Sequence, residues 1–173
     1  MMPCWCCASL GRVRLLFVCM GNICRSPTAE GMMRHVLVQA GLEAQVEVDS
    51  AGTGAWHVGE HPDPRARAAA KRRGIELHSI ARQVTREDLD SFDLVLAADT
   101  SNQQDLLRLA GQDPERRAKV RLLREFDPVS VRTGELDVPD PHYGAPDGFD
   151  RVLDIVDGAC RGLLAEIRAR TQR

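Results

Sequence analysis

The sequence has few aromatic residues and no excess of positive charge. Phe, Trp and Tyr make up only 4% of its 173 residues, and 23 Lys and Arg are balanced by 25 Asp and Glu, for a net charge of −2. A nucleic-acid surface needs clustered basic side chains with aromatic ones among them, whereas the basic residues here are dispersed among acids. We therefore expect no nucleic-acid partner.

Long apolar runs are also absent. No stretch reaches the roughly 18 apolar residues of a membrane span, and no long apolar segment leads to a secretory cleavage site. We therefore expect a cytoplasmic protein without a membrane span. A hydrophobic content of 43% in 173 residues predicts one domain with a substantial core, which we place at residues 12–170.

The cysteines are clustered and leave most of the chain without a thiol. Cys4, Cys6 and Cys7 precede the first apolar run, and no cysteine occurs between Cys24 and Cys160. This is not the distribution of a disulfide framework, and it fits a reducing compartment. We expect residues 1–11 to be a disordered extension, or to follow from a start codon assigned too early. A metal site built from their thiols is the alternative.

What the chain does contain is a regular alternation of strand and helix patterns. Short apolar runs predict buried strands at 13–18, 46–51, 92–99 and 119–123, and helical spacing predicts helices at 27–41, 64–74, 85–88, 101–110 and 149–168. This rhythm predicts an α/β fold: a single-domain, doubly wound, four-stranded parallel sheet with helices on both faces. Such sheets bind ligands at the carboxyl ends of their strands.

The first predicted strand leads directly into the sequence VCMGNICRSP, residues 18–27. The segment combines a strand end, a polar loop and the beginning of a helix in one turn. Such a turn directs backbone N–H groups and the positive end of a helix dipole at one point, where an anion of phosphate size can bind. The same field favours a thiolate at Cys19, and the guanidinium of Arg25 can grip two phosphate oxygens.

Three further residues of this segment have properties that suit such a loop. Gly21 lets the backbone approach an anion closely, and Asn22 tolerates a left-handed conformation. Ser26 can cap the following helix and donate a hydrogen bond to the Cys19 sulfur. A cysteine and an arginine six residues apart also arise by chance, so the pair alone is compatible with a buried strand cysteine beside an ordinary turn.

The full segment resembles the phosphate-binding loop of the low-molecular-weight protein tyrosine phosphatases, V-C-x-G-N-x-C-R-S-P. The resemblance extends from Arg12 to the last predicted helix and implies the same fold, with the phosphate-binding loop after the first strand. It implies that Cys19 is the nucleophile and that Arg25 binds the phosphoryl group. The reaction of this family needs no metal and no cofactor.

Cleavage of a phosphate ester also needs an acid that protonates the leaving oxygen. The residues themselves leave several turn-like acids open as candidates: Asp127, Asp137, Asp140 and Asp147. The segment DPHYG, residues 140–144, resembles the family's D-P-Y-Y-G loop, whose aspartate is the general acid, and this implies Asp140. His142 replaces the first tyrosine of that loop, which makes the slot beside the substrate ring less apolar, whereas Tyr143 remains.

The resemblance also implies the residues that form and support the pocket. Ser50 matches the family's loop-supporting serine, and Ser79 stands where many relatives have a histidine that supports the loop asparagine. Trp56 lies in a glycine-rich loop, where it is either a core residue or a pocket wall. The substrate-binding set is Met20, Gly21, Asn22, Ile23, Cys24, Ser26, Trp56, His142 and Tyr143. Cys24 is either a packed loop residue or the partner of Cys19 in a reversible disulfide.

The function that this reading implies is hydrolysis of phosphotyrosine in a phosphoprotein through a cysteinyl-phosphate, by a chain expected to be a monomer. Three alternatives stay open. Arsenate reductases on this scaffold relay oxidation to cysteines near the third strand, which are missing here. Arginine phosphatases tend to have threonine where Ile23 stands. A non-catalytic phosphate-binding module would use the same loop.

Overall fold

The computed structural model describes residues 11–171. The expectations for residues 1–10, including those for Cys4, Cys6 and Cys7, lie outside the described residues. The expected domain bounds, 12–170, stay a prediction. No described helix is long and apolar enough to cross a membrane.

Four parallel strands form the predicted sheet: β1 (Val13–Cys19), β2 (Val46–Gly52), β3 (Leu94–Ala97) and β4 (Val120–Leu122). Their order is β2-β1-β3-β4. The chain goes from β1 outward to β2 and then crosses to the other side to form β3, so the strand order reverses beside β1. A doubly wound sheet has its ligand site at such a reversal, outside the carboxyl ends of the strands.

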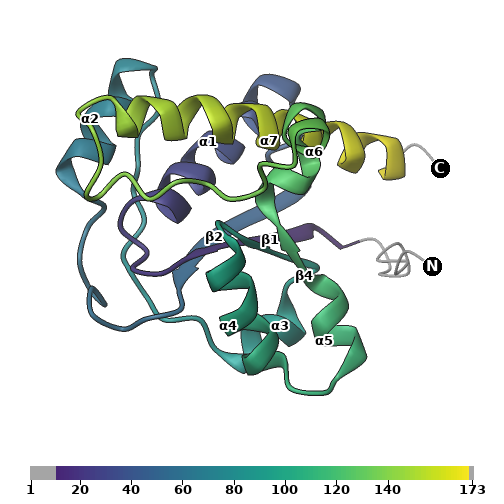
Figure 1. Cartoon of the computed structure of the whole chain (residues 1–173). Coiled ribbons are helices and arrows are strands. Elements are labelled where there is room, and N and C mark those ends of the chain that lie inside the picture. Colours follow the sequence, from purple (N-terminus) through teal and green to yellow (C-terminus); the bar gives the residue numbers. More distant parts are fainter. Residues whose placement is uncertain (1–10, 172–173) are drawn as a thin grey trace.

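Helices cover both faces of the sheet, as expected (Figure 1). The larger core lies beneath α1 (Arg25–Ala40), α2 (Pro64–Arg72) and α7 (Gly148–Thr171). The smaller core lies beneath α3 (Arg86–Ser91) and α4 (Thr100–Ala110). Residues along β1 alternate between them, with Leu15, Phe17 and Cys19 in the larger core. This alternation follows from the two-residue period of a strand.

The helix α1 follows the β1–α1 loop (residues 20–24) and packs along α7. It ends as predicted at Gly41, where the N–H of Gly41 donates to the Val38 carbonyl, and the φ of 68° at Gly41 lets the next N–H, that of Leu42, reach the Leu37 carbonyl. In α7, Gly162 lies against the backbone of Phe126, where an added Cβ would come within 1.8 Å of the Phe126 carbonyl oxygen. Cys160 is fully buried in the core.

Three short elements between β3 and α7 were not predicted from the sequence. These are α5 (Pro114–Lys119), a 3₁₀ helix (Leu123–Phe126) and α6 (Pro128–Thr133). Both α-helices begin with an Asp-Pro pair, in which Asp113 or Asp127 accepts hydrogen bonds from the first turn. This is the pattern of an N-cap followed by proline at the first helical position, so the pattern was present in the sequence. Asp127, one of the candidate acids, is therefore a helix cap.

Candidate active site

Cys19 ends β1 and points its sulfur into the turn that the β1–α1 loop makes. Its side chain is almost fully buried, and its Sγ accepts a hydrogen bond from the N–H of Asn22 at 3.3 Å. The Ser26 hydroxyl lies 3.0 Å from the same sulfur, so the predicted contact is confirmed. The predicted capping role is wrong, because α1 begins at Arg25 and its N-cap position is Cys24, which makes no side-chain capping bond.

Asn22 holds the loop in a conformation that few residues adopt. Its φ is 56°, and within residues 11–171 no other non-glycine residue has a positive φ. Its Nδ2 donates to Ser26 Oγ at 2.8 Å and to Ser50 Oγ at 3.0 Å. The predicted left-handed conformation and the support from Ser50 are both confirmed.

The second side of Asn22 is held by a backbone group and not by the residue expected there. Its Oδ1 accepts a hydrogen bond from the N–H of Arg82 at 3.0 Å. The Ser79 hydroxyl is buried and finds no hydrogen-bond partner among the described residues. The Ser79 side chain therefore makes no hydrogen bond that would support the loop, contrary to the prediction.

Arg25 is the first residue of α1 and is buried at 5% relative exposure. Its Nη1 donates to Asp99 Oδ2 at 2.7 Å and to the Val138 carbonyl at 2.9 Å. Burial acts to lower the pKa of this guanidinium, but the neighbouring Cys19 and Asp99 raise the pKa above its ordinary value. The side chain is therefore a fixed positive charge at the loop.

A pocket of about 110 Å³ opens at the end of β1. It brings together two segments more than 110 residues apart in the sequence, the β1–α1 loop and residues 140–143. The described residues that line it are Cys19, Met20, Gly21, Ile23, Cys24, Arg25, His57, Asp140, His142 and Tyr143. The candidate nucleophile Cys19, the arginine Arg25 and the candidate acid Asp140 thus line the same cavity.

Trp56 is not among the residues that line this pocket. Its side chain is 73% exposed, and its ring lies against Gly54, where an added Cβ would come within 1.9 Å of Trp56 Cζ3. The expectation that Trp56 is a pocket wall is not met in this structure. His57, which the sequence analysis missed, lines the pocket instead and is held by Glu60, 2.9 Å from its Nδ1. Only its position beside Trp56 in the same loop pointed to it.

The segment that contains Asp140 forms the opposite wall of the pocket. One Asp140 oxygen accepts a hydrogen bond from the N–H of His142 at 3.0 Å, which orients the carboxylate within its own turn. The Tyr143 ring is 90% exposed and meets the His142 ring edge to face, with centroids 4.5 Å apart. Asp140 is thus solvent-exposed and still faces the cavity that holds Cys19.

The loop carries a second cysteine, Cys24, which is also buried. Cys19 and Cys24 are both free thiols in this structure. Burial, together with the negative charge of Asp63, raises the pKa of Cys24 to about 12. Cys24 is therefore protonated at neutral pH unless a positive charge binds to it.

The fold and the site together define a phosphate-binding α/β enzyme scaffold. Its parts are a parallel sheet with an anion-binding loop where the strand order reverses, a cysteine at the strand end and a buried arginine at the helix start. Residues 14–173 match the family model described as low molecular weight phosphotyrosine protein phosphatase. The chain belongs to this family. It is therefore a hydrolase that acts on phosphoric monoesters.

Curated relatives and a solved structure agree with this assignment. A low molecular weight protein-tyrosine-phosphatase of Streptomyces coelicolor is 48% identical over 159 residues, which cover 92% of this chain and 96% of that one. A low molecular weight phosphotyrosine protein phosphatase of Schizosaccharomyces pombe is 44% identical over 84% of this chain and 91% of its own length. A protein tyrosine phosphatase structure from Entamoeba histolytica superposes with a TM-score of 0.85 at 38% identity, covering 91% of this chain and 97% of the other.

Proposed function

We propose that this protein hydrolyses phosphotyrosine monoesters in proteins, with Cys19, Arg25 and Asp140 as the catalytic residues. The observation that carries the proposal is that these three side chains line one pocket, although Asp140 comes from a distant segment. A nucleophile, a fixed cation and an exposed acid in one cavity are what phosphoryl transfer to a side chain requires. The names of the relatives support the same substrate class.

In the first step, the Cys19 thiolate attacks phosphorus and forms the S–P bond while the P–O bond to the substrate breaks. Asp140 gives its proton to the leaving oxygen, which departs as tyrosine. The N–H of Asn22 and the Ser26 hydroxyl both lie at hydrogen-bond distance from the sulfur and stabilise its negative charge.

In the second step, Asp140 removes a proton from water, whose oxygen attacks phosphorus and releases the Cys19 thiolate and phosphate. Arg25 binds the phosphoryl oxygens throughout. Its Nη1 is engaged by Asp99 and Val138, whereas Nε and Nη2 have no protein partner within residues 11–171. The pair with Asp99 therefore fixes the plane of the guanidinium and leaves two donors for the phosphate.

The walls of the pocket favour an aromatic ester over phosphoarginine. Ile23 places a partly exposed apolar side chain on the wall, and Met20 and Tyr143 add exposed apolar surface at the mouth. A phenyl ring gains from such contacts, whereas the guanidinium of phosphoarginine loses solvation there. The partner is then a tyrosine-phosphorylated protein. We also place the protein in the cytoplasm as a monomer, since the mechanism needs a reduced Cys19 and uses residues of one chain.

The test compares turnover of p-nitrophenyl phosphate, a phosphotyrosine peptide and phosphoarginine. We expect Cys19→Ser to be inactive, and Asp140→Asn to lose about 10²- to 10⁴-fold in kcat, as removal of a general acid does. Asp147→Asn is the matched control, because it removes an exposed carboxylate from the same segment. Full activity of Cys19→Ser, or faster hydrolysis of phosphoarginine than of the phosphotyrosine peptide, would refute the proposal.

A further inference from the structure

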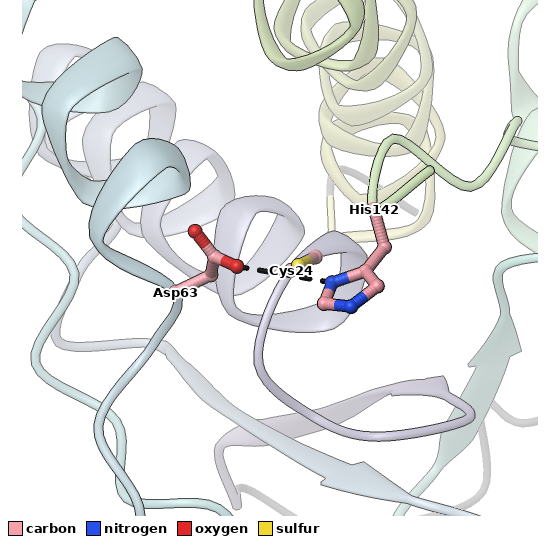
Figure 2. A group of neighbouring side chains, drawn as sticks. All are labelled: Cys24, Asp63 and His142. Atoms are coloured by element: carbon pink, nitrogen blue, oxygen red, sulfur yellow. Dashed lines mark ion pairs between the residues drawn. The ribbon is translucent and has the colours of Figure 1, made fainter. Parts of the chain in front are cut away.

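A second group of chemically reactive side chains lies at the mouth of the pocket. Cys24, Asp63 and His142 come from three different segments, namely the β1–α1 loop, the residue before α2, and the loop before α7 (Figure 2). Their side chains point toward one another, and Cys24 Sγ, one Asp63 oxygen and one His142 nitrogen all lie within 4.8 Å of each other. The proposed phosphatase chemistry does not use this convergence.

The three donor atoms match the preferences of one class of ion. Thiolate sulfur and imidazole nitrogen are ligands of zinc and similar transition metals, and not of Mg²⁺ or Ca²⁺, which take oxygen. Bond lengths of about 2.0 to 2.3 Å in a tetrahedral zinc site place its ligand atoms roughly 3.3 to 3.8 Å apart. The distance from His142 Nδ1 to Asp63 Oδ2 is already 3.9 Å, and all three donor atoms lie within 4.8 Å of one another, so the three side chains have to move inward to reach this geometry.

The place between Asp63 and His142 already attracts a positive charge. Arg65 Nη2 donates to Asp63 Oδ2 at 2.9 Å and lies 3.3 Å from His142 Nδ1. A metal has to displace the Arg65 side chain from both oxygens, because Nε also donates to Asp63 Oδ1 at 3.1 Å, whereas the bond from the Arg65 N–H to Oδ1 at 2.8 Å, which caps α2, can remain. The Arg65 side chain is 53% exposed, so it can turn into solvent, at the cost of its contact with the Phe149 ring, whose centroid lies 4.9 Å from the guanidinium carbon.

We propose that Cys24 Sγ, Asp63 Oδ2 and His142 Nδ1 bind a zinc-type divalent cation, with water as the fourth ligand. On binding, the Cys24 thiol releases its proton to solvent and the Arg65 side chain gives up its two bonds to the Asp63 carboxylate. A divalent ion supplies the positive charge that favours the thiolate of a thiol whose pKa is otherwise raised. His142 is what makes this site possible, because the tyrosine of the family's loop offers no imidazole nitrogen.

The position of the site has a consequence for the proposed phosphatase activity. Cys24 and His142 both line the pocket, and His142 is two residues from Asp140. An ion that joins them ties the β1–α1 loop to the acid-bearing loop and narrows the entrance. We therefore expect zinc to inhibit turnover in the wild-type chain. This consequence rests on the proposed function, whereas metal binding itself does not.

The test uses full-length protein in which Cys4, Cys6, Cys7 and Cys19 are replaced by serine, so that other thiols do not bind the metal. Because this protein has no nucleophile, its metal binding is measured independently of catalysis. The probe is Co²⁺, whose thiolate charge-transfer and visible d–d bands report a tetrahedral site with sulfur, followed by displacement with Zn²⁺. We expect one equivalent of Co²⁺ with both bands.

In this background, we expect Cys24→Ser to abolish the thiolate band. We expect His142→Tyr and Asp63→Asn each to weaken Zn²⁺ binding by more than roughly 10- to 100-fold, which is the loss typical when a residue that only hydrogen-bonds to a ligand is removed. Asn is itself an N-cap residue, so Asp63→Asn preserves the start of α2. The control is His78→Gln, which removes an exposed imidazole that pairs with Glu76 outside the pocket and leaves binding unchanged. Arg65→Ala tightens binding because it removes the competing cation.

Two results would overturn the metal site: absence of a thiolate band in the serine background, or the same affinity in His142→Tyr, Asp63→Asn and His78→Gln. Circular dichroism of each variant shows whether a loss of binding comes from unfolding, and the conservative His142→Gln then replaces a variant that fails to fold. If Co²⁺ binds as expected while the wild-type protein shows no phosphatase activity, the proposed function fails and the metal site stands.

Discussion

Replacing Asn22 by alanine tests the claim that the loop is pre-shaped by its own side-chain network. Asn22 is 1% exposed and makes three hydrogen bonds, to Ser26, Ser50 and the N–H of Arg82. Alanine removes all three and also has to adopt a φ of 56°. Three bonds at about 0.5 to 1.5 kcal/mol each, plus about 1 to 2 kcal/mol for the left-handed backbone, give roughly 3 to 6 kcal/mol.

This loss is large compared with the 5 to 15 kcal/mol that typically separates folded from unfolded protein. We expect the loop to relax before the whole chain unfolds, so that the Asn22 N–H no longer points at Cys19 Sγ. The kcat for p-nitrophenyl phosphate should fall at least about tenfold, which corresponds to about 1.4 kcal/mol of the lost free energy. Urea denaturation measures the stability of the same sample.

Two further variants separate the contributions. Asn22→Gly loses the hydrogen bonds but tolerates positive φ, so it should be about 1 kcal/mol more stable than Asn22→Ala. Ser79→Ala removes the buried hydroxyl that has no partner among the described residues, and we expect no loss of stability or kcat. An Asn22→Ala protein with parental kcat and stability, or a Ser79→Ala protein as impaired as Asn22→Ala, would refute this account of the loop.

Two other predictions concern stability. Gly162→Ala should lower the free energy of unfolding, measured in urea, by about 1 to 3 kcal/mol or more, because the added Cβ would overlap the Phe126 carbonyl. In the control Gly158→Ala, on the same helix, the added Cβ has ordinary contacts, so this variant should be neutral or stabilising. Equal changes in stability for the two variants would contradict the packing argument. Burial acts to raise the pKa of Asp88, but hydrogen bonds from Arg82 outweigh it, so the net effect lowers the pKa below 3.8, its ordinary value. The ionised Asp88 carboxylate therefore stabilises the fold above pH 3.8, and this stabilisation is lost as the pH falls through the lowered pKa. Asp88→Asn should therefore show a smaller loss of stability between pH 7 and pH 3 than the parent, and an unchanged acid dependence would argue against this pair.

The sequence determined the features that depend on neighbours along the chain. The four strands follow from short apolar runs, and the glycine at residue 41 ends α1 because a left-handed cap needs no side chain. The loop conformation at Asn22 was likewise encoded locally, since the residue type tolerates positive φ. Even the missed helices α5 and α6 were encoded by Asp-Pro pairs, of which the pair at Asp127 had been interpreted as a turn.

Only the tertiary structure decided which distant side chains meet. No local sequence pattern indicated that the Arg82 N–H, and not Ser79, completes the hydrogen bonds of Asn22. Nor did one indicate that His57 faces the pocket while Trp56 lies over Gly54. The convergence of Cys24 with two residues from other segments is of the same kind. Local patterns record how a residue relates to its neighbours within a few positions, whereas contacts between loops depend on the sheet order and on the packing of α1, α2 and α7.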